Sequence, residues 1–155
     1  MMLTTKTRYG TRAMFDIAYN STGLPIPIKD IAKRQEITVR YLEQILNSFR
    51  NAGLLKSERG PGGGYLLAKD PSEITVGDIV RAIKEPLDLV CCVSAEPGDP
   101  RACHRAEQCV TRPIWQAASK KIESYFDSVT IADLCEDARK KGVKKESNHP
   151  FEYNI

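Results

Sequence analysis

Residues 28–50 read IKDIAKRQEITVRYLEQILNSFR, and this stretch decides the fold. Apolar residues at helical spacing predict a short helix over 28–34, and residues 35–38 then form a turn. Thr38 is a favourable cap for a longer helix, whose apolar side chains fall on one face: Val39, Leu42, Ile45, Leu46 and Phe49. This order is the helix-turn-helix plan, in which the second helix enters the major groove of DNA. Two helices packed in a core fit the same pattern.

A predicted β-hairpin follows directly. Residues 54–59 and 65–69 have the composition of short strands, and GPGGG at 60–64 lies between them. Gly60, Gly62 and Gly63 permit positive φ and close approach to another backbone. A phosphate-binding loop would need Lys-Ser/Thr and a helix after the glycines, and here a strand follows. We therefore interpret the hairpin as a wing, with Arg59 at its tip able to enter a minor groove or contact phosphate.

Further helices are predicted on both sides of this module. Thr4 or Thr5 caps the first helix, and Lys6 and Arg8 lie near its start, where the helix dipole disfavours cations and an anionic partner would favour them. Thr75 caps another helix, which Glu85-Pro86 ends. No secondary structure is expected in the loop that follows.

A long helix beginning at Pro113 carries an apolar stripe suited to pairing with another helix. Few elements of the same chain are available to cover this stripe, so we expect a homodimer, whose two-fold symmetry would suit a palindromic DNA site. A short helix over 131–141 and a polar tail complete the chain. The stripe consists of Ile114, Trp115, Ala118, Ile122, Tyr125, Phe126 and Val129.

Composition narrows the class of protein. The chain has 155 residues, of which 41% are hydrophobic and 28% charged, as in an ordinary globular domain. No apolar run reaches the roughly 20 residues that span a bilayer, and the start lacks a secretory h-region, so we expect a cytoplasmic protein without a membrane partner. Residues 1–60 hold ten Lys/Arg against five Asp/Glu, and this excess of positive charge suggests a polyanion-binding module.

The cysteines lie in the other half of the chain. Cys91, Cys92, Cys103 and Cys109 fall within 19 residues, and Cys135 stands apart. Cys92, Cys103 and Cys109 do not have the paired spacing of zinc ribbons, and three thiolates on one loop suit an iron–sulfur cluster. Inert thiols, a disulfide switch and an irregular zinc site remain open from spacing alone. No catalytic arrangement of side chains can be assigned, so we do not expect an enzyme.

Several motifs together resemble one family. The sequence is similar to the Rrf-two-type family of bacterial winged-helix transcription regulators, most closely to its iron–sulfur cluster regulator (IscR-like) branch. The segments that carry the resemblance are LTTKTRYG at 3–10, YLEQIL at 41–46, RGPGGGYLL at 59–67, DIVRAI at 78–83, the three cysteines and PIW at 113–115.

The resemblance implies a dimer that crosses through the long helix, and DNA reading by Tyr41, Glu43 and Gln44 with Arg59 at the minor groove. Glu43 also has its own rationale, because a carboxylate accepts a hydrogen bond from cytosine. Arg40 stands where the IscR-like pattern has a small hydroxyl residue, which puts that branch's DNA sequence in doubt.

The resemblance further implies that Cys92, Cys103 and Cys109 bind a 2Fe-2S or 4Fe-4S cluster. The fourth ligand of the related branches is missing from this sequence. Arg112 stands in place of the histidine ligand of the IscR-like branch, and Arg8 stands in place of the acidic ligand of a nitric-oxide-sensing branch. A guanidinium is not expected to ligate iron. The remaining candidates are His104, Cys91, Glu107 and an exogenous ligand.

The sequence thus predicts a mainly α protein: a winged helix-turn-helix of three helices and a hairpin, with a long C-terminal dimerisation helix. We assign residues 1–84 to the DNA-binding domain, 85–112 to a cysteine-rich cluster-binding loop, 113–141 to the dimerisation and terminal helices, and 142–155 to a polar tail. The predicted function is a transcription regulator that senses iron–sulfur status or redox and nitrosative stress through the cluster. The alternative is a cluster-free thiol switch on the same fold. An electron carrier and a protein-binding winged helix are less well supported, and salt-dependent duplex binding would distinguish them from the two regulators.

Overall fold

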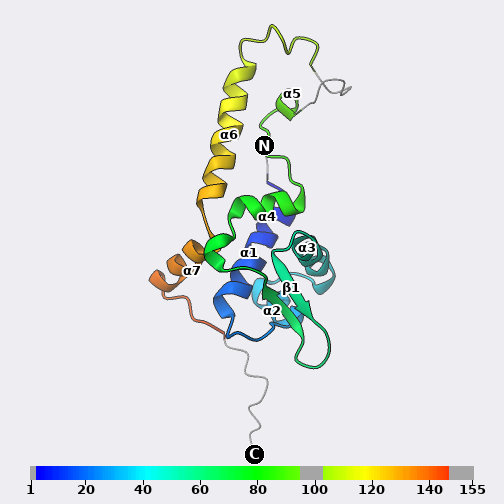
Figure 1. The fold of residues 1–155 in the computed structure, drawn as a ribbon, viewed down its shortest axis with the longest axis vertical. Coiled ribbons are helices and arrows are strands. Elements are labelled where there is room, and N and C mark those ends of the chain that lie inside the picture. The colour runs from blue at the N-terminus through cyan, green and yellow to red at the C-terminus, as the bar shows by residue number, and fades with distance from the viewer. Residues whose placement is uncertain (1–2, 95–102, 147–155) are drawn as a thin grey trace, which may run out of the picture.

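The computed structural model describes residues 3–94 and 103–146. Helices and one two-stranded sheet form a lower body, from which a single long helix projects (Figure 1). This architecture confirms the mainly α prediction. The elements are α1 (Thr5–Asn20), α2 (Ile28–Gln35), α3 (Val39–Asn51), β1 (Leu55–Glu58), β2 (Gly64–Leu67), the 3₁₀ turn η1 (Pro71–Glu73), α4 (Val76–Ile83), α5 (Cys91–Ser94), α6 (Arg112–Ser128) and α7 (Ile131–Lys140).

We call α1 to α4, the hairpin and α7 the head, and the described residues between 85 and 128 the arm. One apolar core fills the head. Met14, Ile31, Leu42 and Phe49 have no exposed surface, and Ile131 brings α7 into the same core. Burying a side chain of this size stabilises a fold by about 1.5–3 kcal/mol. The arm adds little to this core.

Threonine caps fix where the helices begin. Thr38 accepts a hydrogen bond from the backbone N–H of Tyr41, which starts α3 where the sequence predicts. Thr75 forms a capping box with Asp78, again as predicted. Thr4, of the two candidates, caps α1. Two helix ends differ slightly from the prediction. Helix α2 extends to Gln35 rather than residue 34, and α4 stops at Ile83, before Glu85-Pro86.

The second strand of the hairpin is joined to the segment before α2. β1 and β2 pair antiparallel with Leu55 opposite Leu67 and Glu58 opposite Gly64. Tyr65 also exchanges two backbone hydrogen bonds of 2.9 Å with Ile26, so that the segment before α2 acts as a third short strand. A Cβ on Gly64 would overlap the Ile26 carbonyl, which explains the need for glycine there.

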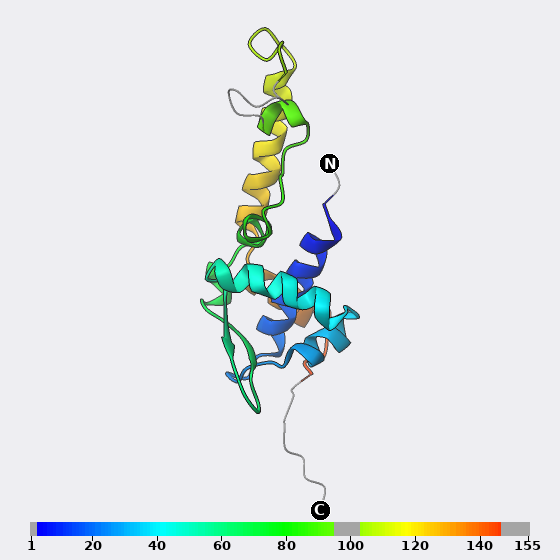
Figure 2. The same cartoon turned by 90° about the vertical axis from the view of Figure 1, so that its right-hand side faces the viewer.

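The base of α6 is fixed to the head. Val76 donates a backbone hydrogen bond of 2.9 Å to Val129, and Ile131 donates one of 2.9 Å to Ile74. Arg81 of α4 forms an ion pair of 2.8 Å with Asp127 near the end of α6. From this attachment α6 extends away from the head, with α5 beside its upper part in both views (Figures 1 and 2).

The segment before α6 corrects one expectation. We expected no secondary structure between α4 and α6, but residues Cys91–Ser94 form one helical turn. The Val93 N–H donates a hydrogen bond of 3.1 Å to the Val90 carbonyl at the start of this turn. The Leu89 N–H donates to the Ser119 hydroxyl at 3.1 Å, which anchors the segment to α6. No helix among the described residues is long and apolar enough to cross a membrane.

Candidate nucleic-acid interface and cysteine segment

The exposed face of α3 holds the predicted base-reading residues. Arg40, Glu43 and Gln44 are exposed, and Tyr41 is half-buried at the edge of the same face. The opposite face of the helix is buried in the core. Since 3.6 residues complete a turn, the apolar side chains that hold α3 leave these polar side chains directed outward. The helix therefore presents donors and acceptors to a partner while its orientation is fixed from behind.

Two different elements flank this face. On one side Arg50 donates a hydrogen bond of 3.4 Å to Ser57 of the hairpin. On the other side the Tyr41 ring meets the Tyr9 ring of α1 edge-on, with centroids 6.1 Å apart, and Arg12 lies 5.5 Å from the Tyr9 centroid. The wing and the start of α1 thus border α3 from opposite sides.

The wing tip has the conformation that its glycines predict. Arg59, Gly60 and Gly62 are exposed, and the two glycines have φ of 96° and 76°. Gly63 donates to the Gly60 carbonyl at 3.0 Å, and a Cβ there would overlap the Glu58 carbonyl. The hairpin projects beyond the rest of the head (Figure 2). In the first turn of α1, Lys6 is half-buried and Arg8 is exposed.

A buried polar network positions the helix-turn-helix, and the sequence analysis missed it. Asp16 of α1 is 1% exposed and pairs with Arg34 of α2 at 2.7 Å. Gln35 donates to the same carboxylate at 2.8 Å, and Arg12 donates to the Gln35 side chain at 3.0 Å. The hydrogen bond to Asp16 raises the Arg34 pKa. An acidic residue on the apolar side of α1 is the signal that could have revealed this network.

The described cysteines lie in different surroundings. Cys92 is half-buried, and its backbone carbonyl accepts a 3.1 Å hydrogen bond from Nε of Arg112. Cys91, Cys103 and His104 are exposed, whereas Cys135 is buried in the head, where burial raises its thiol pKa. Within residues 3–94 and 103–146, no three His, Cys, Asp or Glu side chains are arranged to hold a metal. The predicted ligands are therefore not brought together.

Cys109 nevertheless has the chemistry of a metal ligand. Its sulfur lies 3.3 Å from the Thr111 hydroxyl. This hydrogen bond, followed by those from the backbone N–H groups of Thr111 and Arg112, holds the pKa of the Cys109 thiol below its ordinary value. A thiolate is the form of cysteine that binds metals. The donor set of three cysteines thus fits a soft, thiolate-bound centre. The Arg112 side chain, in contrast, already contacts the Cys92 carbonyl.

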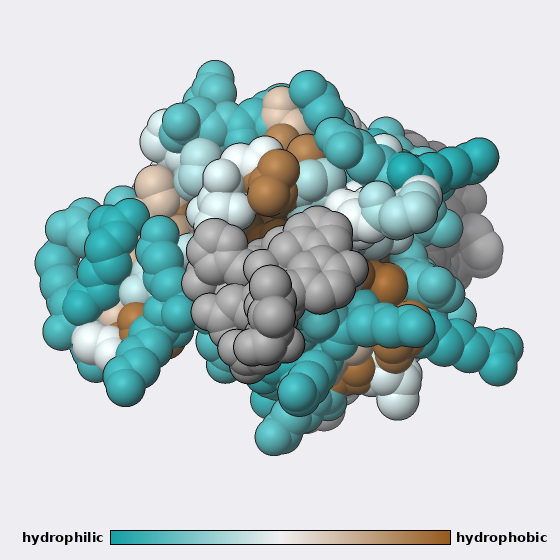
Figure 3. All heavy atoms as spheres, turned by 90° about the horizontal axis from the view of Figure 1, so that it is seen from below, coloured by the Kyte–Doolittle hydropathy of each residue, from teal (hydrophilic) through white to brown (hydrophobic). Residues whose placement is uncertain are grey.

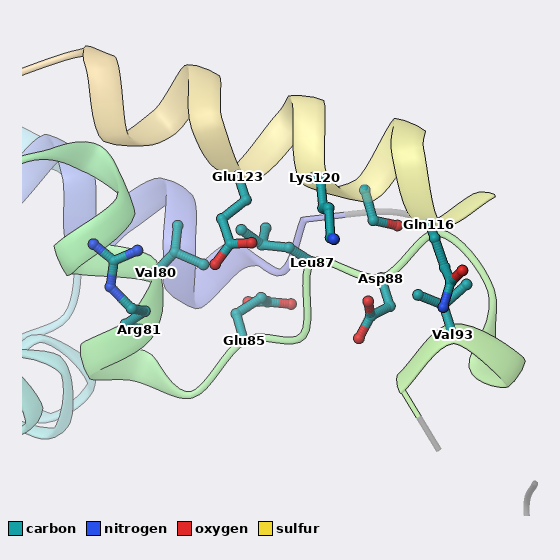
Figure 4. A pocket seen from close by; sticks show the side chains of 10 residues that line it. Val80, Arg81, Glu85, Leu87, Asp88, Val93, Gln116, Lys120 and Glu123 are labelled. Atoms are coloured by element: carbon teal, nitrogen blue, oxygen red, sulfur yellow. The ribbon is translucent and has the colours of Figure 1, made fainter. Parts of the chain in front are cut away.

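A cleft of about 370 Å³ separates α4 and the start of the arm from α6. Glu85 and Asp88 face Lys120 and Glu123 across it (Figure 4). Glu85 also reaches α1, where its carboxylate accepts hydrogen bonds from the Thr4 hydroxyl and, at 2.5 Å, from the Thr7 hydroxyl. Partial burial raises the Glu85 pKa, but these hydrogen bonds outweigh it and the net pKa is lowered.

The arm exposes apolar surface. Val110, Ile114, Trp115 and Tyr125 are 87%, 58%, 41% and 65% exposed. Ser119 is the one buried residue of α6. In contrast, the lower end of the molecule, opposite the arm, is covered mainly by hydrophilic side chains, with small apolar areas between them (Figure 3). A helix of this composition is expected to have a partner surface.

Comparison with known proteins identifies the family. Residues 3–137 match the family described as "Rrf2: Iron-dependent Transcriptional regulator". The chain belongs to the Rrf2 family of transcriptional regulators. A curated relative, the HTH-type transcriptional regulator IscR of Serratia proteamaculans, is 42% identical over 134 residues, which cover 86% of this chain and 79% of that protein.

Solved Rrf2-like structures share the fold. The structure of T. potens IscR superposes with a TM-score of 0.72 at 36% identity and covers 94% of each chain. That of CymR (YrzC), the global cysteine regulator of B. subtilis, superposes with a TM-score of 0.70 at 34% identity, covering 88% of this chain and 98% of that one. These comparisons confirm the predicted family and the winged-helix fold. The description of the family names transcriptional regulation and does not mention catalysis. The roles of individual residues stay predictions.

Proposed function

We propose that this Rrf2 regulator binds duplex DNA as a homodimer and that an iron–sulfur cluster in its arm controls that binding. The observation that carries the DNA-binding part is the exposed polar face of α3, bordered by the wing and by the basic start of α1. A major groove about 12 Å wide admits one helix, and phosphates line both of its edges. The borders of α3 provide cations for both edges.

The residues have different roles in this proposal. Arg40, Tyr41, Glu43 and Gln44 read base edges from α3. Arg59 enters the adjacent minor groove or contacts its phosphates, and Gly60, Gly62 and Gly63 let the wing backbone approach the duplex. Lys6 and Arg8 contact phosphates from α1. Base contacts set the sequence preference, whereas phosphate contacts set affinity and register.

Binding to a randomised duplex library, followed by titration of the selected duplex, tests this assignment. Replacing Glu43 by Ala should change the base preference at one position, since a carboxylate accepts from the cytosine amino group. Arg59→Ala should weaken binding to all sequences alike. Lys141→Gln, at the end of α7, is the control and should do neither. Identical base preferences of wild type and Glu43→Ala would contradict the reading role of Glu43.

The apolar stripe of α6 supports the dimer. Its apolar side chains recur mostly at three- and four-residue steps, the spacing by which two helices interlock, and Ile114, Trp115 and Tyr125 among them are exposed. A two-fold dimer presents two copies of α3, which favours a palindromic operator. Because each copy adds its own contacts, loss of the dimer should lower DNA affinity greatly.

For the arm, we assign Cys92, Cys103 and Cys109 as cluster ligands, with His104 and Cys91 as candidates for a fourth position. A bound cluster, of the 2Fe-2S or 4Fe-4S type, would supply a group whose oxidation state or integrity responds to iron, oxygen or nitric oxide. The lowered pKa of Cys109 supports this role, because it raises the share of the thiolate, the form of cysteine that binds metals. IscR relatives support it as well.

The chain's own contacts offer a route from the arm to the head. The arm begins at Glu85, which binds the first turn of α1 through Thr4 and Thr7. The first part of the arm is attached to α6 by the hydrogen bonds of Leu89 to Ser119 and of Arg112 to Cys92. Any rearrangement of the cysteines thereby acts on α1, which borders the recognition helix. This is a two-state proposal, in which one state of the arm binds DNA better than the other.

Iron and acid-labile sulfide per chain, measured after anaerobic purification, test the arm. We expect stoichiometric iron and sulfide with visible charge-transfer bands. Replacing Cys92, Cys103 or Cys109 singly by Ala should abolish them, and Cys135→Ala, in the head, should not. A colourless protein that resists reconstitution would favour the thiol-switch alternative, for which the similarity to CymR, a cysteine regulator, is the supporting observation.

A further inference from the structure

We propose that Lys84, together with Lys6, forms a second phosphate-binding site for DNA on the side of α3 opposite the wing. This inference rests on the proposed DNA binding and goes beyond it, because Lys84 lies on α4, outside the helix-turn-helix and the wing. Its basis is a polar cleft at the junction of three helices, a lysine in an unfavourable backbone conformation, and the position of both relative to the recognition face.

The cleft lies among the start of α1, the end of α3 and the end of α4. Its volume is about 440 Å³, and Lys6, Ser48, Asn51 and Lys84 contribute its polar walls. Arg81 also lines it but forms ion pairs with Asp78 at 2.9 Å and Asp127 at 2.8 Å. Among the described residues, Lys6 and Lys84 form no ion pair. Glu85, whose pKa the charge of Lys6 helps to lower, offsets part of this positive charge and also accepts hydrogen bonds from Thr4 and Thr7.

The position of the cleft follows from the geometry of α3. Successive helical residues are 100° apart, so Tyr41, Ser48 and Ala52 lie along one edge of the helix and Glu43 and Arg50 along the other. The edge with Arg50 contacts the wing. The edge with Tyr41 contacts α1, and its Ser48 and Ala52 line the cleft. The exposed face of α3 is thus bordered by the wing on one side and by the cleft on the other.

A helix in the major groove lies between two phosphate backbones. The wing side already offers Arg59 to one of them. The cleft offers two ammonium groups and the Asn51 amide to the other, and each of these can donate to phosphate oxygens. Asn51, which is exposed, also lines the cleft, so a phosphate bound there would lie beside the exposed face of α3 and the helix could stay in the groove. An ammonium is a compact point charge that suits a phosphate at this position.

The backbone of Lys84 supports a functional role. Lys84 follows α4 in the left-handed conformation, with φ of 60° and ψ of 39°. Glycine is the residue usually found at this position, because a Cβ is unfavourable there. A lysine also interacts favourably with the helix dipole, which is a purely structural reason for its presence. Replacement by glycine separates the two explanations, since it removes the charge but keeps the turn.

The experiment uses the whole 155-residue chain and a duplex selected by the wild type from a random library. Affinity is measured between about 50 and 200 mM KCl. Each phosphate contact contributes about 0.9 to the slope of log affinity against log salt, so a dimer of Lys84→Gly should lose about 1.8. The ratio of wild-type to variant affinity should then shrink about tenfold over this range. The base preference should not change, and the melting temperature should stay the same or rise.

Two further variants sharpen the result. Lys84→Arg keeps the charge and should keep the wild-type slope. Lys141→Gln removes a lysine at the matching end of α7, across the head from α3 (Figure 1), and should also keep it. An unchanged slope in Lys84→Gly, with wild-type binding intact, would overturn the inference and leave the proposed function standing. Absence of salt-dependent binding by the wild type would overturn both.

A second experiment tests whether the cleft binds free phosphate instead of a phosphate of DNA. Inorganic phosphate replaces chloride at constant ionic strength, in the absence of DNA. We expect phosphate to leave the melting temperatures of wild type and Lys84→Gly equally unaffected, since one phosphate of a duplex is held mainly by its neighbours. Stabilisation of the wild type alone would mean that the cleft takes a free anion, and this would overturn its assignment to DNA.

Discussion

The head and the arm differ in how much of their apolar surface is buried. In the head, large apolar side chains such as Met14, Leu42 and Phe49 are fully covered. No buried side-chain nitrogen or oxygen among the described residues lacks a hydrogen-bond partner. In α6 of the arm, by contrast, a single residue, Ser119, is buried, while Ile114 and Tyr125 are more than half exposed. The head is complete within one chain, and the arm is not.

This difference assigns stability and regulation to separate regions. A 17-residue helix with a single buried residue gains little from burial and is only marginally stable by itself. We expect its order to depend on what it binds, and the proposed partners are a second copy of α6 and a group held by the cysteines. A region of low intrinsic stability is suited to change state, whereas the head keeps the geometry of α3 constant.

The largest effect should come from the buried pair in the head. Asp16→Ala removes the carboxylate that binds Arg34 and Gln35. Breaking a buried ion pair on one side costs about 3–5 kcal/mol, and we expect the free energy of unfolding to fall by that amount. Urea denaturation measures it. Glu136→Ala removes an exposed pair on α7 and should leave the denaturation midpoint unchanged. A similarly small shift for Asp16→Ala would show that the head does not depend on this network.

The second effect concerns the arm alone. Ile114→Glu together with Tyr125→Glu places two charges on the exposed stripe of α6, where a single chain tolerates them. Sedimentation should then detect monomers, and DNA affinity should fall by about 100-fold, or about 2.7 kcal/mol, because each head binds alone. The control is Ser124→Glu, which adds a charge off the stripe and should leave the dimer intact. A double variant that remains dimeric would place the dimer interface elsewhere.

The third effect tests whether the wing belongs to the head. Gly64→Ala brings a methyl group against the Ile26 carbonyl, and such overpacking costs about 1–3 kcal/mol. Gly62→Ala is the matched variant. A Cβ at Gly62 would meet open space, so its only cost, about 1 kcal/mol, comes from the positive φ at that position. Urea denaturation of the two proteins compares these costs. Equal losses would mean that the bridge between Tyr65 and Ile26 does not hold the hairpin in place.

The sequence predicts the elements that depend on local rules. Thr38 and Thr75 start α3 and α4, the glycines shape the wing tip, and the stripe of α6 is exposed as its spacing suggests. The family and its fold follow mainly from short motifs of adjacent residues. The residues on the outer face of α3 are also placed correctly, because one turn of helix separates inside from outside.

What the sequence does not predict depends on contacts between distant residues. Asp16 meets Arg34 only because α1 crosses α2, and Glu85 meets Thr7 across 78 positions. Neither contact leaves a periodic trace in the sequence. The arrangement of Cys92, Cys103 and Cys109 likewise involves residues far apart in the sequence, and residues 95–102 between the first two lie outside the described residues. Their role as ligands is therefore a prediction still, as is the division of the chain at residues 85 and 113.

The smallest effect concerns the junction between the two regions. Glu85→Gln weakens the hydrogen bonds that tie the start of the arm to Thr4 and Thr7. Because the folded pKa of Glu85 is lowered, its contribution to stability is present above the pKa of the unfolded chain and is lost as the pH falls through the folded pKa. With screening of this partly exposed group, we expect a loss of less than about 1 kcal/mol at pH 7, and this loss should disappear once the pH lies below the folded pKa of Glu85. Urea denaturation at pH 7 and at a series of lower pH values measures this, with Glu58→Gln on the exposed hairpin as control. A loss that persists in acid would mean that the arm is joined to the head by contacts independent of the Glu85 charge, and the two regions would then be less separate than their burial suggests.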